Sequence, residues 1–188
     1  MKSYVFCLIV LVSVSAAFAQ GRVTQSFDRD WLFFKSDAAG AEATGYADAS
    51  WCQLDVPHDW SIEGPFDAKN TTSGSGGFLP SGIGWYRKHF PVAAGDKGKR
   101  VFVEFDGVMA NSDVWINGVH LGVRPYGYVS FGYELTDHIK FGGDNVIAVR
   151  ADNSQQPASR WYSGAGIYRH ARLVVTNAIH LERWSTFV

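Results

Sequence analysis

The feature that most constrains the fold is a series of short apolar runs divided by turn residues, none of which keeps a helical period. The run KRVFVEFDGV at 99–108 puts Val101, Val103 and Phe105 on one face of an extended chain, since successive strand side chains point to opposite faces. No stretch sustains an apolar period of about 3.6 residues over three turns. The chain is therefore predicted to be all-β.

Turn residues divide the rest of the chain into further strands. Asn117 and Gly118 readily take the positive φ angles of a two-residue hairpin turn, so 112–122 is predicted to form two paired strands. A sandwich is favoured, and the long excursion at 52–83 suits a jelly roll better than an up-and-down barrel. Other strands are expected within 31–36, 84–92, 145–152 and 170–176.

Two segments are expected to differ from this strand pattern. Residues 133–143 have room for one helical turn, with Thr136 or Asp137 as its cap, before two glycines end it. The low-complexity stretch NTTSGSGG at 70–77 is interpreted as a mobile surface loop. Neither segment changes the predicted fold class.

The first nineteen residues have the pattern of a secretory signal peptide. Lys2 supplies the positive start, an apolar run follows at 4–18, and the AFA sequence at 17–19 fits the rule for cleavage between small residues. The run is too short for a stable membrane span. We expect 1–19 to be removed and the mature chain to be periplasmic or extracellular, with an uncleaved anchor as the less favoured alternative.

Charge and cysteine content narrow the classes of partner. The chain has 17 Lys and Arg against 18 Asp and Glu, and cleavage removes Lys2 alone among them, so the mature net charge is −2. No basic run of five residues is present, which argues against a nucleic-acid partner. Cys7 leaves with the signal peptide, so Cys52 has no partner for a disulfide within the mature chain.

The patterns that mark a catalytic site are scarce. Neither G-x-S-x-G nor H-E-x-x-H occurs, and the six histidines lack the short spacing of a zinc site. The loop at 54–67 brings four carboxylates together, and two carboxylates about 5–10 Å apart would suit glycoside hydrolysis. A local turn at Asp59 and solvated charges explain the same residues. No catalytic residue, metal ligand or cofactor is therefore predicted in this chain.

The stretch SRWYSGAGIYR at 159–169 places aromatic residues and an arginine beside two glycines. Gly164 and Gly166 indicate a sharp turn or a close approach of the backbone. Trp161 and Tyr162 then either pack the loop or offer a flat apolar surface to a ligand. For Trp161, packing in the core is the favoured interpretation.

Five segments follow one another in the order and spacing of a known module. They are VPHDWSIEG at 56–64, GIGWYRKHF at 82–90, FDGVMANSDVWINGVHLG at 105–122, NVIAVRADN at 145–153 and SRWYSGAGIYRHARL at 159–173. Together they resemble the N-terminal sugar-binding domain of glycoside hydrolase family 2, and most of all its β-galactosidase-like members. The resemblance implies a galactose-binding-domain-like jelly roll at 20–177. It further implies that 178–188 begins a linker or an immunoglobulin-like domain.

The same resemblance implies a longer enzyme in which this domain is not catalytic. In the family, an immunoglobulin-like sandwich and a (β/α)₈ barrel follow, and the barrel carries both glutamates of a mechanism that retains anomeric configuration. The expected partners are a carbohydrate substrate and these downstream domains. A membrane partner is not expected after signal cleavage, and homo-oligomerisation is left open. β-Galactosidase is the favoured activity of the whole protein.

The loop at 159–169 is implied to reach the mouth of the barrel and to wall the sugar subsite. Some members carry an acidic residue where this chain has Arg160, and a guanidinium donates hydrogen bonds whereas a carboxylate accepts them. The resemblance therefore does not fix the sugar. The residues expected to bind substrate are Arg160, Trp161, Tyr162, Asp59 and His58.

Two other functions fit the aromatic composition. One is a free-standing carbohydrate-binding module, a lectin-like sandwich that holds glycans with exposed Trp and Tyr. The other is a sandwich used for protein interaction or adhesion. The stretch NAIHLERWSTFV at 177–188 resembles the start of a new strand pair, which favours a domain within a longer protein.

Overall fold

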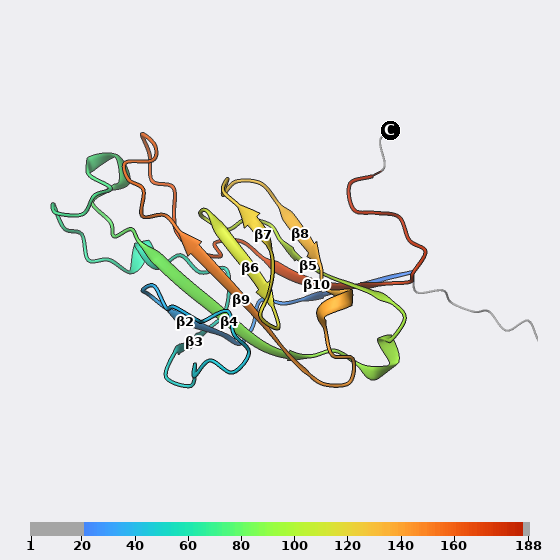
Figure 1. The fold of residues 1–188 in the computed structure, drawn as a ribbon. Coiled ribbons are helices and arrows are strands. Elements are labelled where there is room, and N and C mark those ends of the chain that lie inside the picture. The colour runs from blue at the N-terminus through green and yellow to red at the C-terminus, as the bar shows by residue number, and fades with distance from the viewer. Residues whose placement is uncertain (1–20, 186–188) are drawn as a thin grey trace, which may run out of the picture.

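Residues 21–185, which the computed structural model describes, form a sandwich of two antiparallel sheets (Figure 1). The smaller sheet has the order β1 (Arg22–Ser26), β10 (Ala171–Thr176), β5 (Arg100–Phe105) and β8 (Phe131–Glu134). The larger sheet has the order β3 (Cys52–Leu54), β2 (Trp31–Phe34), β4 (Ile83–Pro91), β9 (Asp144–Asp152), β6 (Ser112–Ile116) and β7 (Val119–Arg124). The predicted all-β sandwich is confirmed, and its assignment to the jelly rolls stays a prediction. The predicted signal peptide at 1–19 lies outside the described residues.

The strands predicted from apolar runs are present. In β5, Val101, Val103 and Phe105 have no exposed surface, as their alternation indicated. The hairpin between β6 and β7 turns at Asn117 and Gly118, whose φ angles are 50° and 84°. A two-residue turn with positive φ angles at both positions matches the right-handed twist of the two strands that it joins.

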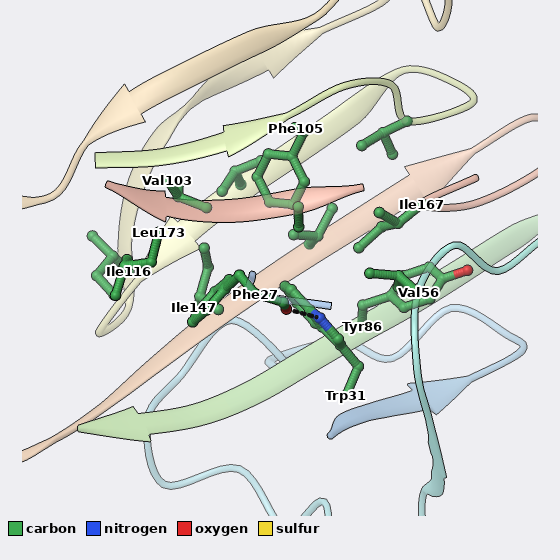
Figure 2. Packing of buried hydrophobic residues seen from close by; sticks show 14 of the residues in the cluster. Phe27, Trp31, Val56, Tyr86, Val103, Phe105, Ile116, Ile147, Ile167 and Leu173 are labelled. Atoms are coloured by element: carbon green, nitrogen blue, oxygen red, sulfur yellow. Dashed lines mark hydrogen bonds between the residues drawn. The ribbon is translucent and has the colours of Figure 1, made fainter. Parts of the chain in front are cut away.

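The main core lies between the two sheets, and Figure 2 shows part of it. Phe105 and Leu173 of the smaller sheet face Trp31 and Ile147 of the larger one in this view. The indole nitrogen of Trp31 donates to the carbonyl oxygen of Phe27 at 2.8 Å, so a large buried ring keeps its polar atom satisfied. This core gives the loops at the sandwich ends a rigid support.

A second apolar cluster lies on the outer face of the larger sheet, beneath the loop that precedes β3. The rings of Trp85 and Trp115 stack with centroids 5.3 Å apart. Arg87 is fully buried there, with its Nε 2.7 Å from Asp48 Oδ2. The Arg87 guanidinium also donates to the carbonyl oxygen of Ala43 at 3.0 Å, which ties the loop to the sheet.

One structural prediction near the C-terminus is wrong. Residues 177–185 form no strand within the described range, so the expected new strand pair is absent there. These residues instead contact the smaller sheet through side chains. Arg22 Nη2 donates to the Leu181 carbonyl at 2.8 Å, and Arg183 lies 2.9 Å from the Glu104 carboxylate. Side-chain contacts of this kind fix the segment without the backbone ladder of a strand.

The short helical elements also refine the sequence predictions. The predicted turn is η4 (Thr136–His138), but its N-cap is Leu135, while the Thr136 hydroxyl accepts a hydrogen bond from the Val101 amide. The stretch at 70–77 contains the 3₁₀ turn η2 (Gly74–Gly76). A third turn is η3 (Ala94–Asp96). None of the helical elements between residues 21 and 185 is long and apolar enough to cross a membrane.

Candidate functional site

Loops from both sheets gather at one end of the sandwich. Figure 1 shows the green and teal loop between β3 and β4, and the orange loop between β9 and β10, projecting together away from the C-terminal end. The orange loop includes 159–169, and the other includes His58 and Asp59. The structure therefore places all five predicted binding residues on these two neighbouring loops.

Asp59 joins these two loops. It precedes the 3₁₀ helix η1 (Trp60–Glu63), and its Oδ1 accepts from the Ser61 amide at 3.0 Å, which is the local turn predicted from sequence. The same oxygen accepts from the Ala165 amide at 3.0 Å, and Oδ2 accepts from the Tyr162 hydroxyl at 2.6 Å. The carboxylate is thus fully engaged as an anchor between two loops.

Tyr162 remains protonated over the ordinary pH range. Burial raises the pKa of its phenol, and the hydrogen bond to the Asp59 carboxylate raises it further, because ionisation would place two negative charges together. The side chain is 38% exposed. Tyr162 therefore holds the loop through its hydroxyl and keeps part of its ring surface in solvent.

His58 forms a second anchor next to Asp59. Its Nδ1 lies 2.8 Å from the hydroxyl of Tyr86, and its Nε2 lies 2.9 Å from Glu63 Oε1. Burial raises the pKa of Tyr86 well above its usual value, so this hydroxyl keeps its proton and can donate it to Nδ1. The His58 backbone amide also donates to the Ile167 carbonyl at 2.8 Å.

The two glycines of the 159–169 loop have the conformation that the sequence indicated. Gly164 and Gly166 have φ angles of 84° and 85°, a region that favours glycine. A Cβ on Gly166 would overlap the Tyr86 hydroxyl and lie 2.9 Å from the ring of Trp60. Close packing and backbone conformation therefore both require glycine at 166.

The interpretation of Trp161 as a core residue is wrong. Its side chain is 61% exposed, and its indole nitrogen donates to the Tyr128 hydroxyl at 3.2 Å. The space beneath the loop is filled instead by Trp60 and Ile167, neither of which has exposed surface. Trp161 is held at the surface, where a ligand can reach its ring.

Arg160 makes no side-chain hydrogen bond or ion pair with the other predicted site residues, all of which the structure describes, and neither does Trp161. The Arg160 side chain is exposed, and within residues 21–185 its guanidinium has no hydrogen bond or ion pair. A guanidinium in this state keeps all its donors available for a ligand. The structure thus uses His58, Asp59 and Tyr162 in hydrogen bonds within the protein, whereas Arg160 and Trp161 are exposed.

Sequence reasoning missed three residues of this region. Asn153, at the end of β9, is buried, and its Nδ2 donates to the Gly164 carbonyl at 3.0 Å. Tyr126 and Tyr128 lie on the loop before β8 with exposed rings that contact each other, and the Tyr128 hydroxyl accepts from Trp161. The signal for the two tyrosines was the stretch PYGYVS at 125–130, where aromatic residues flank a glycine within a turn-like segment.

The chemistry offered by this end of the sandwich is that of binding. Asp59 is engaged by three donors and Glu63 by His58, so the loop carboxylates are used within the protein. In the part of the chain that is described, no three His, Cys, Asp or Glu side chains come together as metal ligands. Exposed aromatic faces and a free guanidinium suit a polar ligand that contains rings.

Comparison with known proteins identifies relatives over nearly the whole chain. No protein-family model matches the chain. The β-galactosidase BoGH2A of Bacteroides ovatus is 52% identical over 174 residues, which are 93% of this chain and 20% of that protein. A β-glucuronidase of Formosa agariphila is 38% identical over 173 residues, which are 85% of this chain and 18% of that protein.

Solved structures agree with these sequence matches. A glycosyl hydrolase family 2 member from Bacteroides cellulosilyticus has a TM-score of 0.85 and 46% identity, covering 88% of this chain and 22% of that one. A β-glycosidase from Bacteroides vulgatus has a TM-score of 0.80 and 47% identity, covering 82% and 20%. The chain spans about a fifth of the length of the curated relatives it matches first. By sequence and by fold it belongs to glycoside hydrolase family 2, of which it represents one β-sandwich domain.

Proposed function

We propose that the chain is the N-terminal, non-catalytic domain of a secreted, retaining family 2 glycoside hydrolase that removes terminal β-linked sugars. The observation that carries this is the 52% identity to a β-galactosidase over 93% of the chain and 20% of the relative. β-Galactosidase is the favoured activity for that reason. The signal-like pattern at 1–19 supports export to the periplasm or the exterior.

In this proposal the domain contributes binding residues to a sugar site completed by the rest of the enzyme. The Asp59 carboxylate accepts from Tyr162 and from the Ala165 amide, and the His58 amide donates to the Ile167 carbonyl, and these bonds hold the 159–169 loop against the neighbouring loop. A loop fixed in this way presents Arg160 and Trp161 to the ligand with little entropy left to lose on binding. The protein's own hydrogen bonds therefore preorganise its share of the site.

Two proteins test this proposal: residues 20–188, and the product of the longer reading frame that contains them. Both are assayed with nitrophenyl β-galactoside, β-glucuronide and β-mannoside. We expect the longer protein to hydrolyse the β-galactoside and residues 20–188 to hydrolyse none of the three. Turnover by residues 20–188 that survives repurification and is lost in Asp59→Asn would contradict the proposal and make the 54–67 loop an active site.

A free-standing carbohydrate-binding module is the second candidate function. Exposed aromatic rings such as Trp161 and Tyr126 favour it, since such rings hold glycans in lectin-like sandwiches. A reading frame that ends at Val188, together with glycan binding by the chain alone, would select this candidate. A reading frame that continues into a barrel would select the hydrolase.

A further inference from the structure

Three aromatic side chains from two separate loops share one exposed surface at the site end of the sandwich. Tyr126, Tyr128 and Trp161 are 62%, 40% and 61% exposed. Large aromatic rings that could have been buried rarely cluster in solvent without a binding role. We call these three residues the aromatic platform.

The aromatic platform is held in a fixed arrangement before any ligand arrives. The Trp161 indole donates to the Tyr128 hydroxyl at 3.2 Å, and the rings of Tyr126 and Tyr128 lie 5.5 Å apart with an angle of 63° between them. Between the tyrosines, the Gly127 carbonyl accepts from the Tyr168 hydroxyl at 3.0 Å. The loop is therefore bonded to the 159–169 loop at two points.

Packing beneath the platform also limits its movement. A Cβ at Gly127 would lie 2.5 Å from Met109 Sδ and 3.1 Å from Met109 Cα, so the backbone rests directly on a buried side chain. Tyr and Trp on such a support supply a large contact area with few rotatable bonds to freeze. The platform therefore lies on a packed and hydrogen-bonded support.

The chemistry of the platform fits a pyranose ring. Aromatic faces are electron-rich and attract the C–H groups on the apolar face of a sugar, while phenol hydroxyls bond to the sugar's edge. Arg160, which precedes Trp161 in the chain and is exposed, adds hydrogen-bond donors. The platform is also continuous with the proposed sugar site, because Trp161 belongs to both.

We propose that the aromatic platform binds a second sugar ring, next to the terminal sugar that is cleaved, so that the enzyme prefers oligosaccharides to single-ring glycosides. Tyr126 is the residue specific to this second ring. The inference rests on the proposed function, since it requires a cleaved terminal sugar nearby. It adds a specificity to that function: recognition of the sugar ring next to the one that is cleaved.

The test compares two substrates of the longer enzyme that differ by one ring. β-Galactosyl fluoride carries a single ring, and lactose carries two. We expect Tyr126→Ala to lower the ratio of kcat/KM for lactose to kcat/KM for the fluoride by about tenfold, the size of one lost aromatic contact. Tyr126→Phe keeps the ring and should restore the ratio to within about twofold.

A matched control excludes a general effect of removing an exposed ring. Phe66 is 76% exposed on the neighbouring loop and lies outside the platform, so Phe66→Ala should leave the ratio unchanged. A ratio that does not move in Tyr126→Ala overturns the inference. So does an equal loss on both substrates, because that would place Tyr126 at the first ring or in the fold.

Failure of the proposed function is distinguishable from failure of the platform. If the wild-type longer protein hydrolyses neither substrate, residues 20–188 are titrated with lactose and followed by tryptophan fluorescence. A saturable change that is lost in Trp161→Phe and in Tyr126→Ala supports the platform without hydrolysis. Absence of any change in the wild type overturns the platform as well.

Discussion

The hydroxyl of Tyr162 donates to Asp59 Oδ2 at 2.6 Å, joining loops whose residues are 103 positions apart in sequence. Hydrogen bonds to charged groups contribute about 1.5–3 kcal/mol when they are buried and less when they are partly exposed, as here. Tyr162→Phe should therefore lower the free energy of unfolding by about 1 kcal/mol. Asp59→Ala removes the acceptor of three donors and should cost about 3 kcal/mol. Urea denaturation of residues 20–188 measures both.

Tyr126→Phe is the control for this comparison, because it removes a phenol hydroxyl from an exposed ring at the same end of the sandwich. It should change the free energy of unfolding by less than about 0.5 kcal/mol. Equal losses in Asp59→Ala and Tyr126→Phe would show that Asp59 does not join the two loops in solution.

Asp48 neutralises a guanidinium that has no exposed surface. Breaking a buried pair by removing one partner typically costs about 3–5 kcal/mol, because the remaining charge is buried without compensation. Asp48→Asn should lower the free energy of unfolding by that amount, since Arg87 Nε would lose its charged acceptor at 2.7 Å. A loss below about 1 kcal/mol would mean that water reaches Arg87 and replaces the carboxylate.

The ion pair between Asp48 and Arg87 also predicts that the free energy of unfolding depends on pH. Burial raises the pKa of Asp48, but hydrogen bonds from Arg87 and His89 outweigh it, so the pKa lies below its ordinary value. A lowered folded-state pKa gives stability that is complete above the unfolded pKa of about 3.9 and is lost as the pH falls through the folded value. In a His89→Ala background, the loss of stability caused by Asp48→Asn should be constant from about pH 5 to 7 and shrink below about pH 4. Denaturation at each pH checks this, and a loss that grows on acidification would contradict it.

Alanine substitutions at Gly166 and Gly40 separate the stability cost of close packing from the cost of backbone strain. Their φ angles are 85° and 84°, so alanine meets the same conformational cost at both, about 1–2 kcal/mol. A Cβ on Gly40 would meet no atom within 4 Å, whereas one on Gly166 would overlap the Tyr86 hydroxyl. Gly166→Ala should therefore be more destabilising than Gly40→Ala by about 2 kcal/mol or more. Thermal unfolding of the two variants gives the difference.

A double variant identifies the clashing group. Tyr86→Phe removes the hydroxyl nearest to the added methyl group, so Gly166→Ala should cost less in that background than in the wild type. The ring of Trp60, at 2.9 Å, keeps the recovery incomplete. Strict additivity of the two changes would show that the loop moves away from Tyr86 instead of overlapping it.

Much of the fold could be predicted from sequence patterns that extend over only a few residues. The alternation of Val101, Val103 and Phe105 and the turn at Asn117 and Gly118 act within a few residues, and the structure has both features. The short strands β1, β3 and β8 went unpredicted. Residues 133–134 of β8 belong to the segment that was expected to form a helical turn, and the turn begins only at Thr136. All five residues of β1 are exposed, and β3 has only three residues, so neither leaves an apolar pattern to read.

The candidate site could not be predicted in the same way, because it depends on contacts between residues that are far apart in the sequence. Asp59 was placed in a local turn, which is correct, but its bond to Tyr162 depends on how distant loops meet. Trp161 was assigned to the core because large apolar rings are usually buried, yet Trp60 already fills that space. Which of two tryptophans takes one cavity is decided by the packing of both sheets, and the sequence of one loop does not contain that information.

Arg160 gives the prediction that bears most directly on the proposed sugar site. Its guanidinium is exposed and has no partner within the described residues, so its loss leaves no buried group unsatisfied. Arg160→Ala should change the free energy of unfolding by less than about 0.5 kcal/mol. In the longer enzyme, charged hydrogen bonds to the sugar are worth about 1.5–3 kcal/mol, so the variant should lower kcat/KM by roughly ten- to a hundredfold. Trp161→Ala alters an exposed ring and should also leave the fold intact. Unchanged kinetics in Arg160→Ala would mean that the arginine contacts solvent and not the sugar, whereas loss of stability would mean that it supports the loop.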